Sequence, residues 1–192
     1  MAALMANKGV IYAVDRKETR LDLVRSNCRR LGAQIVVPIG GDIRQPREWV
    51  PMIGRAEASS VKKAGVGKPF LDRILVDAPC SGLGVLRRHP EAKWRKGEQA
   101  LPRHQALQCQ ILEAVAPRLR PGGVLVYSTC STEAEENEGV IDQFLRSHAE
   151  FRRESVAPWL PEGGQNFLTE RGDLSTMGNR YSMDAFYAAR LK

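Results

Sequence analysis

The stretch LVDAPCSGLG, residues 75–84, runs from an apolar strand pattern into a loop that carries an acid and a thiol. The strand pattern ends at Asp77, and Pro79 fixes the backbone directly before Cys80. Two glycines after the cysteine predict a shaped loop rather than an immediate helix start. The stretch therefore predicts a buried strand whose carboxyl end presents Asp77 and Cys80.

The stretch LVYSTCSTEAEENE, residues 125–138, repeats this arrangement with Cys130 at the end of a second apolar run. Thr132 and Glu135 have the spacing of a capping box and predict that a helix starts here. Amides at a helix N-terminus favour a thiolate, so Cys130 has the sequence context of a reactive sulfur. Free cysteines are usually small buried core residues, and that alternative stays open for both thiols.

Strand and helix patterns alternate along the rest of the chain. Strands are predicted at 10–14, 34–42 and 72–80, and helices at 16–32, at 104–119 and after Thr132. Gly32 is the stop signal of the first helix, and 52–69 is interpreted as a loop that could contain a short helix. The apolar helix faces are expected to hold Leu21, Val24, Cys28 and Leu31, then Leu107, Ile111, Val115 and Leu119, then Val140, Ile141, Phe144 and Leu145, with Cys109 as a packing residue.

This alternation predicts a single α/β domain with a mostly parallel sheet. The last two strand patterns, 151–156 and 184–191, have no helix pattern between them and predict an antiparallel edge. No apolar run approaches the roughly 20 residues that a membrane span needs, so no membrane partner is expected. The four cysteines and three histidines form no zinc pattern, which predicts free thiols, no metal and a reducing, cytoplasmic location.

The formal net charge of +7 suits a polyanionic partner, most simply a nucleic acid. A basic but otherwise ordinary soluble surface is the alternative. In open parallel sheets, ligands bind outside the carboxyl ends of the strands, where Asp15 and Asp42 also lie. Such acids can accept hydrogen bonds from the ribose and adenine of a nucleotide, although helix capping explains each of them equally well.

Two stretches, DAPCSGLGVLRRHPEAKW (77–94) and VYSTCSTEAEENEGVI (126–141), strongly resemble the RNA cytosine-5 methyltransferases of the RsmB/Fmu/Sun family, the group with the NOL1/NOP2/Sun domain. The resemblance extends over the whole chain. Residues 13–32 look like the ribose-binding strand and helix of the family, and 184–192 like its closing strand, with Ala185 where glycine is more usual.

The resemblance implies a Rossmann-like class I methyltransferase sheet with an antiparallel C-terminal edge strand. It implies S-adenosylmethionine-dependent methylation of carbon 5 of a cytosine in RNA, with 16S rRNA as the first expectation and tRNA as the second. Cys130 would add to carbon 6 of the cytosine, and Cys80 would help to release the product. Asp77 would hold the cytosine or lie against the methyl donor, and Asp15 and Asp42 would bind the ribose and adenine of the cofactor.

The basic stretch after Cys80 is the expected RNA contact, because enzymes that modify bases take the target out of its stack. Its members are Arg87, Arg88, His89, Lys93, Trp94, Arg95 and Lys96. The cations would contact phosphates and Trp94 would stack on a base. The alternative for Trp94 is a packing anchor of the loop.

The sequence departs from the family pattern in one respect: a glycine-rich methyl-donor loop of the AAPGGKT type does not occur in it. The first strand of the sheet and the N-terminal RNA-binding extension are also expected to be missing. Residues 1–192 are therefore predicted to be one partial catalytic domain, inactive or impaired by itself. Either a gap should open between the strands that end at Asp15 and Asp77, or these strands should shift together and misplace apolar surface.

Two other functions remain open at this point. A DNA cytosine-5 methyltransferase would attack with Cys80 instead of Cys130, although the long match after Cys130 argues against it. A non-catalytic RNA-binding remnant would keep the basic surface without holding the cofactor. A cysteine protease is a weak interpretation, because no histidine has a recognisable motif around it. The sequence does not indicate an oligomeric state.

Overall fold

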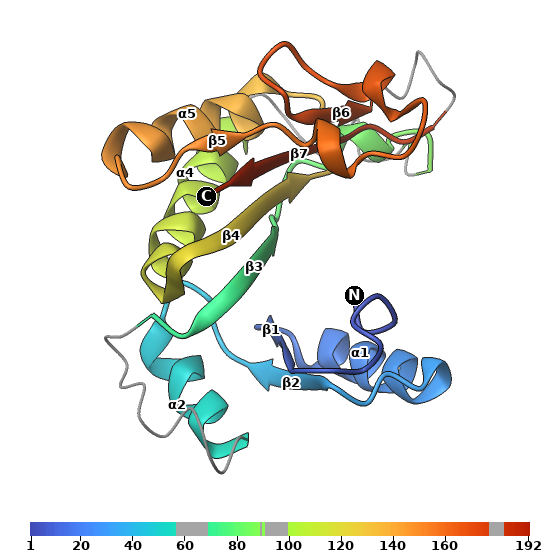
Figure 1. The fold of residues 1–192 in the computed structure, drawn as a ribbon, viewed down its shortest axis with the longest axis vertical. Helices are drawn as coiled ribbons and strands as arrows, with labels where there is room; N and C mark the ends of the chain where they lie inside the picture. Colours follow the sequence, from blue (N-terminus) through green and yellow to red (C-terminus); the bar gives the residue numbers. More distant parts are fainter. Residues whose placement is uncertain (57–68, 89, 91–99, 177–182) are drawn as a thin grey trace. The chain divides into compact units, whose positions relative to one another are not determined.

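The computed structural model describes residues 1–56, 69–88, 90, 100–176 and 183–192. The chain divides into two compact units, Met1–Phe70 and Leu71–Lys192. Each unit combines strands with helices (Figure 1). The predicted α/β class is therefore confirmed.

The unit Met1–Phe70 is built on two parallel strands. β1 (Ile11–Asp15) pairs with β2 (Val36–Gly40), residue for residue, up to Asp15 opposite Gly40. α1 (Glu18–Leu31) connects the two strands and buries Leu21 against them. The helix ends at Gly32, whose φ of 65° lies in the left-handed region that glycine adopts readily, so the predicted stop signal is confirmed.

The expected apolar face of the first helix is wrong at one residue. Leu31 is 68% exposed, because it is the last residue of α1 and the buried face has ended before it. Residues 52–56, expected in a loop that could contain a short helix, form the end of α2 (Pro46–Ala56), so the helix alternative holds for them. The apolar stripe of α2, whose members Trp49, Val50 and Ile53 are at most 3% exposed, begins before the stretch that was interpreted as a loop. Residues 57–68, the rest of that stretch, lie outside the described residues.

The unit Leu71–Lys192 is built on a five-stranded sheet with the strand order β3-β4-β7-β5, in which β6 also pairs with β7. Its strands are β3 (Leu71–Asp77), β4 (Leu119–Thr129), β5 (Arg153–Glu154), β6 (Leu174–Thr176) and β7 (Phe186–Leu191). β3 and β4 are parallel, whereas β7 runs antiparallel to β4, β5 and β6. The predicted antiparallel C-terminal strand and its pairing with 151–156 are confirmed.

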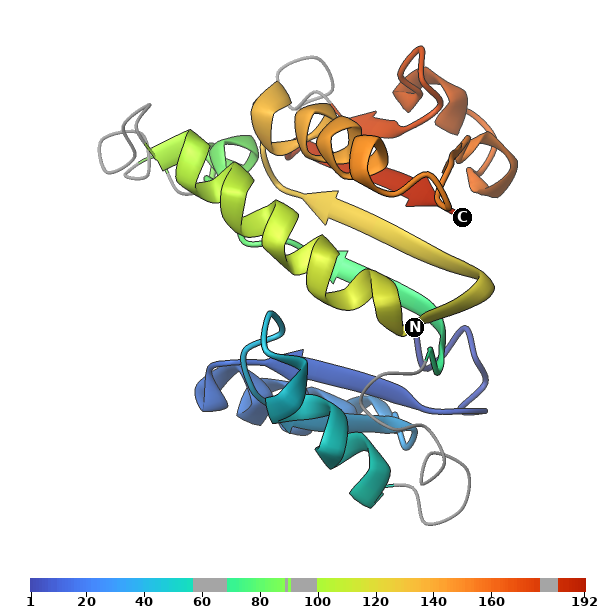
Figure 2. The same cartoon turned by 90° about the vertical axis from the view of Figure 1, so that its left-hand side faces the viewer.

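Two helices, α4 (Leu101–Val115) and α5 (Glu138–Ser147), lie side by side on one face of this sheet (Figure 2). Leu112 of α4 and Ile141 of α5 are fully buried together with Leu125 of β4. Cys109 is buried in α4, as expected of a packing residue. Shorter 3-10 turns occupy Leu83–Val85, Ala116–Arg118, Ala134–Glu136, Ala157–Trp159 and Gly164–Phe167.

Among the described residues, β1 pairs only with β2 and β3 pairs only with β4, so each is an edge strand of its own sheet. Leu75 on β3 is 51% exposed. The description of residues 1–192 as one partial domain stays a prediction. Within the described ranges, no helix is both long enough and apolar enough to cross a bilayer.

Replacing Leu112 with alanine should lower the free energy of unfolding by about 2–5 kcal/mol, because a fully buried leucine leaves a cavity. The matched control is Leu23→Ala on α1, where the leucine is 64% exposed and the change should stay within about 0.5 kcal/mol. Urea unfolding followed by circular dichroism measures both. Equal losses in the two variants would contradict the assignment of the core.

Candidate active site

The two predicted thiols meet at one end of the sheet. The Sγ atoms of Cys80 and Cys130 lie 3.3 Å apart, and both cysteines are half-buried and outside any disulfide. They meet because β3 and β4 are parallel neighbours with Asp77 opposite Ser128, so that the loops after both strands leave the sheet side by side. The sequence-predicted cysteines are thus brought together by the pairing of their strands.

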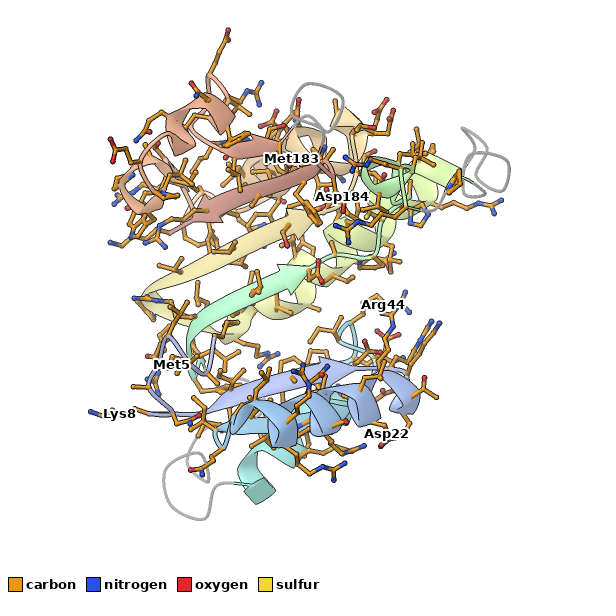
Figure 3. All side chains as sticks on the ribbon, turned by 90° about the vertical axis from the view of Figure 1, so that its right-hand side faces the viewer. Met5, Lys8, Asp22, Arg44, Met183 and Asp184 are labelled. Carbon is orange, nitrogen blue, oxygen red and sulfur yellow. The ribbon has the colours of Figure 1, made fainter. Side chains whose placement is uncertain are left out.

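Backbone hydrogen bonds join these loops to the start of β7. The Gly84 N–H donates to the carbonyl oxygen of Cys130 at 3.0 Å, and the Ala185 N–H donates to the carbonyl of Gly84 at 2.8 Å. A Cβ atom at Gly84 would overlap the Ala185 carbonyl oxygen and lie 2.8 Å from that of Cys130. Glycine is therefore required here by the close approach of two backbones. Asp184, labelled in Figure 3, lies directly before Ala185 and binds Arg88 at 2.8 Å.

A buried carboxylate links the two loops from inside. Glu136 is fully buried and accepts the Ser81 N–H at 2.8 Å, the Ser131 hydroxyl at 2.6 Å and the Gln108 amide at 3.1 Å. The Ser81 hydroxyl also donates to it in a short hydrogen bond. Ser81 follows Cys80 and Ser131 follows Cys130, so one carboxylate holds the residue next to each thiol. Glu136 was not predicted from the sequence, although its place in the STCSTEAEENE stretch was the available signal.

Asn137 fixes the turn after Cys130. Its Oδ1 accepts the Thr129 hydroxyl at 2.5 Å, and its Nδ2 donates to the carbonyl oxygen of Ser131 at 3.0 Å. These bonds connect the last residue of β4 with the turn that carries the thiol. The position of Cys130 is therefore set by side-chain hydrogen bonds on both sides of it.

The predicted capping box is wrong. The Thr132 hydroxyl donates to the Glu133 carboxylate at 2.8 Å, and no side-chain cap bond starts either the 3-10 turn Ala134–Glu136 or α5. The reason is that Glu136 is drawn inward by buried donors, which makes a 3-10 turn and delays α5 until Glu138. The amides of α5 therefore do not begin next to Cys130, and they give no account of its reactivity.

The surroundings of the Cys80 thiol favour its protonated form. The pKa of the Cys80 thiol is raised, first by its hydrogen bond to Cys130, then by burial and by repulsion from a charge on Cys130. A thiol that donates to a neighbouring sulfur is stabilised in its protonated form. Cys80 therefore keeps its proton in this pair.

The three acids predicted at the strand ends have different surroundings. Asp77 is exposed, and its carboxylate has no hydrogen-bond partner among the described residues. Asp15 accepts the Lys17 N–H at 2.7 Å just before α1 and has Arg20 at 3.4 Å. This bond goes to the amide of Lys17, the N-cap residue itself, and α1 has no side-chain cap hydrogen bond, so the capping alternative for Asp15 is wrong. The Asp15 carboxylate keeps further acceptor capacity.

Asp42 is bound by Arg44. The carboxylate accepts the Arg44 N–H at 3.0 Å and the guanidinium at 2.5–3.2 Å. The hydrogen bonds from the Arg44 side chain are the main reason that the pKa of Asp42 falls to about 2. A ligand at this carboxylate would have to displace or share Arg44.

The expected RNA-contacting stretch is described only in part. Arg87 and Arg88 are both exposed on the turn that follows Leu83–Val85. Lys93, Trp94 and Arg95, with His89 and Lys96, lie outside the described residues. In the part of the chain that is described, no group of three or more histidine, cysteine or acidic residues is arranged to hold a metal ion.

Known proteins resemble the whole chain. Residues 1–192 match the family model described as 16S rRNA methyltransferase RsmB/F. The probable ribosomal RNA small subunit methyltransferase B of Synechocystis sp. is 36% identical over 194 residues, which cover all of this chain and 39% of the relative. Ribosomal RNA small subunit methyltransferase B of Yersinia pseudotuberculosis is 40% identical over 161 residues, 84% of this chain and 34% of the relative. The chain thus spans well under half the length of these relatives.

Solved structures share this fold at 28% and 31% sequence identity. The crystal structure of NSun6 from Pyrococcus horikoshii with SFG matches all of this chain and 43% of its own, with a TM-score of 0.76 and 28% identity. A methyltransferase homolog protein from Pyrococcus horikoshii matches 99% of this chain and 55% of its own, with a TM-score of 0.71 and 31% identity.

Replacing Gly84 with alanine should destabilise the protein by about 3 kcal/mol, because the added Cβ meets two backbone carbonyls that cannot move away separately. Gly40→Ala is the matched control, since a Cβ there would have its nearest neighbours at 3.7 Å. Thermal unfolding of both variants measures the difference. A Gly84→Ala protein as stable as the parent would contradict the close approach of Cys130 and Ala185.

Replacing Cys130 with alanine should shift alkylation of Cys80 by iodoacetamide to lower pH, because it removes the hydrogen bond that does most to raise the pKa of Cys80. Only the thiolate reacts, so at a fixed pH near 8 the rate at Cys80 should rise. Mass spectrometry of the labelled peptides gives the rate at each pH. Cys109→Ala should leave the profile unchanged, and an unchanged profile in Cys130→Ala as well would refute the coupling of the two sulfurs.

Proposed function

The chain belongs to the RsmB/F family of 16S rRNA methyltransferases, and we propose that it carries the catalytic thiols of an enzyme that methylates carbon 5 of a cytosine in 16S rRNA. The fold is the Rossmann-like fold of class I S-adenosylmethionine-dependent methyltransferases. The observation that carries the proposal is the 3.3 Å separation of two thiols at the ends of neighbouring parallel strands. Curated relatives named as ribosomal RNA methyltransferases support RNA as the substrate class.

The chemistry requires a nucleophile, because carbon 5 of cytosine does not attack a methyl donor by itself. In the proposal, the Cys130 thiolate forms a bond to carbon 6, and the ring electrons shift so that carbon 5 becomes nucleophilic. Carbon 5 then takes the methyl group. Loss of the carbon 5 proton to a base and breaking of the carbon 6–sulfur bond restore the aromatic ring and free Cys130.

Cys80 is proposed as the group that resolves the adduct. Before Cys130 bonds to the cytosine, the hydrogen bond between the two sulfurs keeps the pKa of Cys80 high. Once the sulfur of Cys130 is bonded to carbon, it carries no charge and competes less for that proton. The pKa of Cys80 then falls, so that a thiolate base becomes available beside the substrate at the step that removes the carbon 5 proton.

S-adenosylmethionine is the methyl donor of this family and supplies the methyl group when it is bound. Asp15 fits a ribose contact, because its carboxylate lies at the carboxyl end of β1 and keeps acceptor capacity. Asp77, exposed at the end of β3, fits a contact with the cytosine or the donor. Asp42 fits an adenine contact less well, because Arg44 occupies its carboxylate.

Binding of the methyl donor and of RNA is also proposed from these residues. These 192 residues alone should hold the donor weakly and be impaired in catalysis, since a glycine-rich loop of the AAPGGKT type is not among them. Arg87 and Arg88 would contact RNA phosphates, and Lys93, Trp94 and Arg95 are proposed as further RNA contacts from the sequence alone. Cysteines outside any disulfide and a ribosomal RNA substrate support a cytoplasmic location, and tRNA remains the second substrate candidate.

In a protein that joins these residues to a glycine-rich methyl-donor loop, the proposal predicts a covalent complex with 16S rRNA that contains 5-azacytidine. The complex should form at saturating S-adenosylmethionine and survive denaturing electrophoresis. Cys130→Ser should abolish this complex, whereas Cys80→Ser should retain it because only release is impaired. The reverse pattern would assign the attack to Cys80, as in a DNA cytosine-5 methyltransferase. No complex together with no S-adenosylmethionine binding in calorimetry would favour a non-catalytic RNA-binding role.

A further inference from the structure

We propose that Glu136 is a positioning residue that holds the thiols of Cys80 and Cys130 at reacting distance. Its importance for catalysis rests on the proposed function, but its effect on the two sulfurs does not. The hydrogen bonds of Glu136 to described residues go to Ser81, Gln108 and Ser131 and not to either sulfur. Glu136 therefore acts through the residues beside the cysteines.

The Glu136 carboxylate is buried without a described cation beside it. Glu136 is 0% exposed, and no lysine, arginine or histidine in the described residues pairs with it. An ionised carboxylate without a cation is expensive to bury and is tolerated only when hydrogen bonds replace its hydration. Four donors do so here, from Ser81, Gln108 and Ser131. The carboxylate is therefore held by a complete and specific set of donors.

The donors to the Glu136 carboxylate come from separate elements of the fold. Ser81 belongs to the loop after β3, Ser131 to the loop after β4, and Gln108 to α4. The Gln108 amide also donates to the carbonyl oxygen of Pro79 at 2.9 Å, directly before Cys80. Glu136 itself lies in the turn before α5. The carboxylate thus joins three segments that are distant in sequence: the loop after β3, α4, and the stretch from Ser131 to Glu136.

The two serines that bind Glu136 lie deeper in the protein than the cysteines that precede them. Both serines are almost fully buried, with 1% and 2% exposure, whereas the cysteines that precede them are half-buried. The hydroxyl oxygens of the two serines lie 3.2 Å apart and donate to the same carboxylate oxygen, Oε2. The serines are the inner anchors and the thiols are presented outward from them. The separation of the anchors therefore sets the separation of the sulfurs.

Glutamine at position 136 has nearly the same shape but only one acceptor oxygen. Its NH₂ group would face donors that the second carboxylate oxygen now accepts. The anchors would have to reorient, and the two loops would no longer share one fixed point. A purely stabilising role would instead predict lower stability with the thiol pair unchanged whenever the variant is folded.

The test uses diamide, which takes two hydrogens from a thiol pair to become a hydrazine while the two sulfurs form a disulfide. In the 192-residue protein, the rate of Cys80–Cys130 disulfide formation, measured by mass spectrometry, should fall about tenfold or more in Glu136→Gln, since small displacements of reacting groups have large effects on rate. Loss of a buried negative charge would by itself favour the thiolate and speed the reaction. A slower formation of the disulfide would therefore show that the two sulfurs have moved out of their reacting position.

Glu135→Gln is the matched control, because Glu135 is the neighbouring, exposed acid, and it should react at the parent rate. A folded Glu136→Gln protein that forms the disulfide at the parent rate would overturn the proposal. If Glu136→Gln does not fold, Ser131→Ala removes one anchor alone and should slow the reaction, and a parent rate there would overturn the proposal equally.

The diamide reaction needs neither RNA nor methyl donor, so it separates this inference from the proposed function. If the protein methylates RNA, Glu136→Gln should lower kcat and leave KM for RNA nearly unchanged, because the residue lies beneath the thiols and not on an RNA-binding surface. Failure to methylate any RNA would leave the disulfide result standing.

Discussion

The parallel pairing of β3 with β4 is the constraint on which the site depends. Parallel neighbours end at the same edge of a sheet, and the register that sets Asp77 opposite Ser128 gives both following loops the same starting level. Two thiols separated by fifty positions in the chain can then lie 3.3 Å apart. An antiparallel arrangement of the same two strands would send the loops to opposite ends of the sheet.

The pairing brings the loops together, but smaller features decide how the sulfurs face each other. Gly84 permits two backbones to approach more closely than any side chain would allow. Glu136 and Asn137 then replace solvent as the partners of buried polar groups in the turn around Cys130. At this distance the hydrogen bond between the sulfurs also raises the pKa of Cys80, so the geometry that joins the loops favours the protonated form of this thiol.

Much of this could be predicted from residue patterns. The strand ends at Asp15, Asp77 and Cys130 follow from runs of β-branched residues, and the end of α1 follows from a glycine with positive φ. Patterns failed where tertiary contacts outweighed local preference. The capping box between Thr132 and Glu135 was not formed, because the next residue is drawn into the interior by buried donors. The start of α2 was not predicted, because its buried residues Trp49 and Val50 lie before the stretch whose composition indicated a loop.

The sequence by itself determined the α/β class, the strand ends that carry acids and thiols, and the family to which the chain belongs, because each of these is written in local pattern or in long contiguous motifs. Only the tertiary structure decided that the two sulfurs touch, that Arg44 occupies Asp42, and that Glu136 rather than Glu135 faces inward. The physical reason is that hydrogen-bond partners of buried groups come from segments far apart in the chain. Local spacing carries no information about which of those partners will be present.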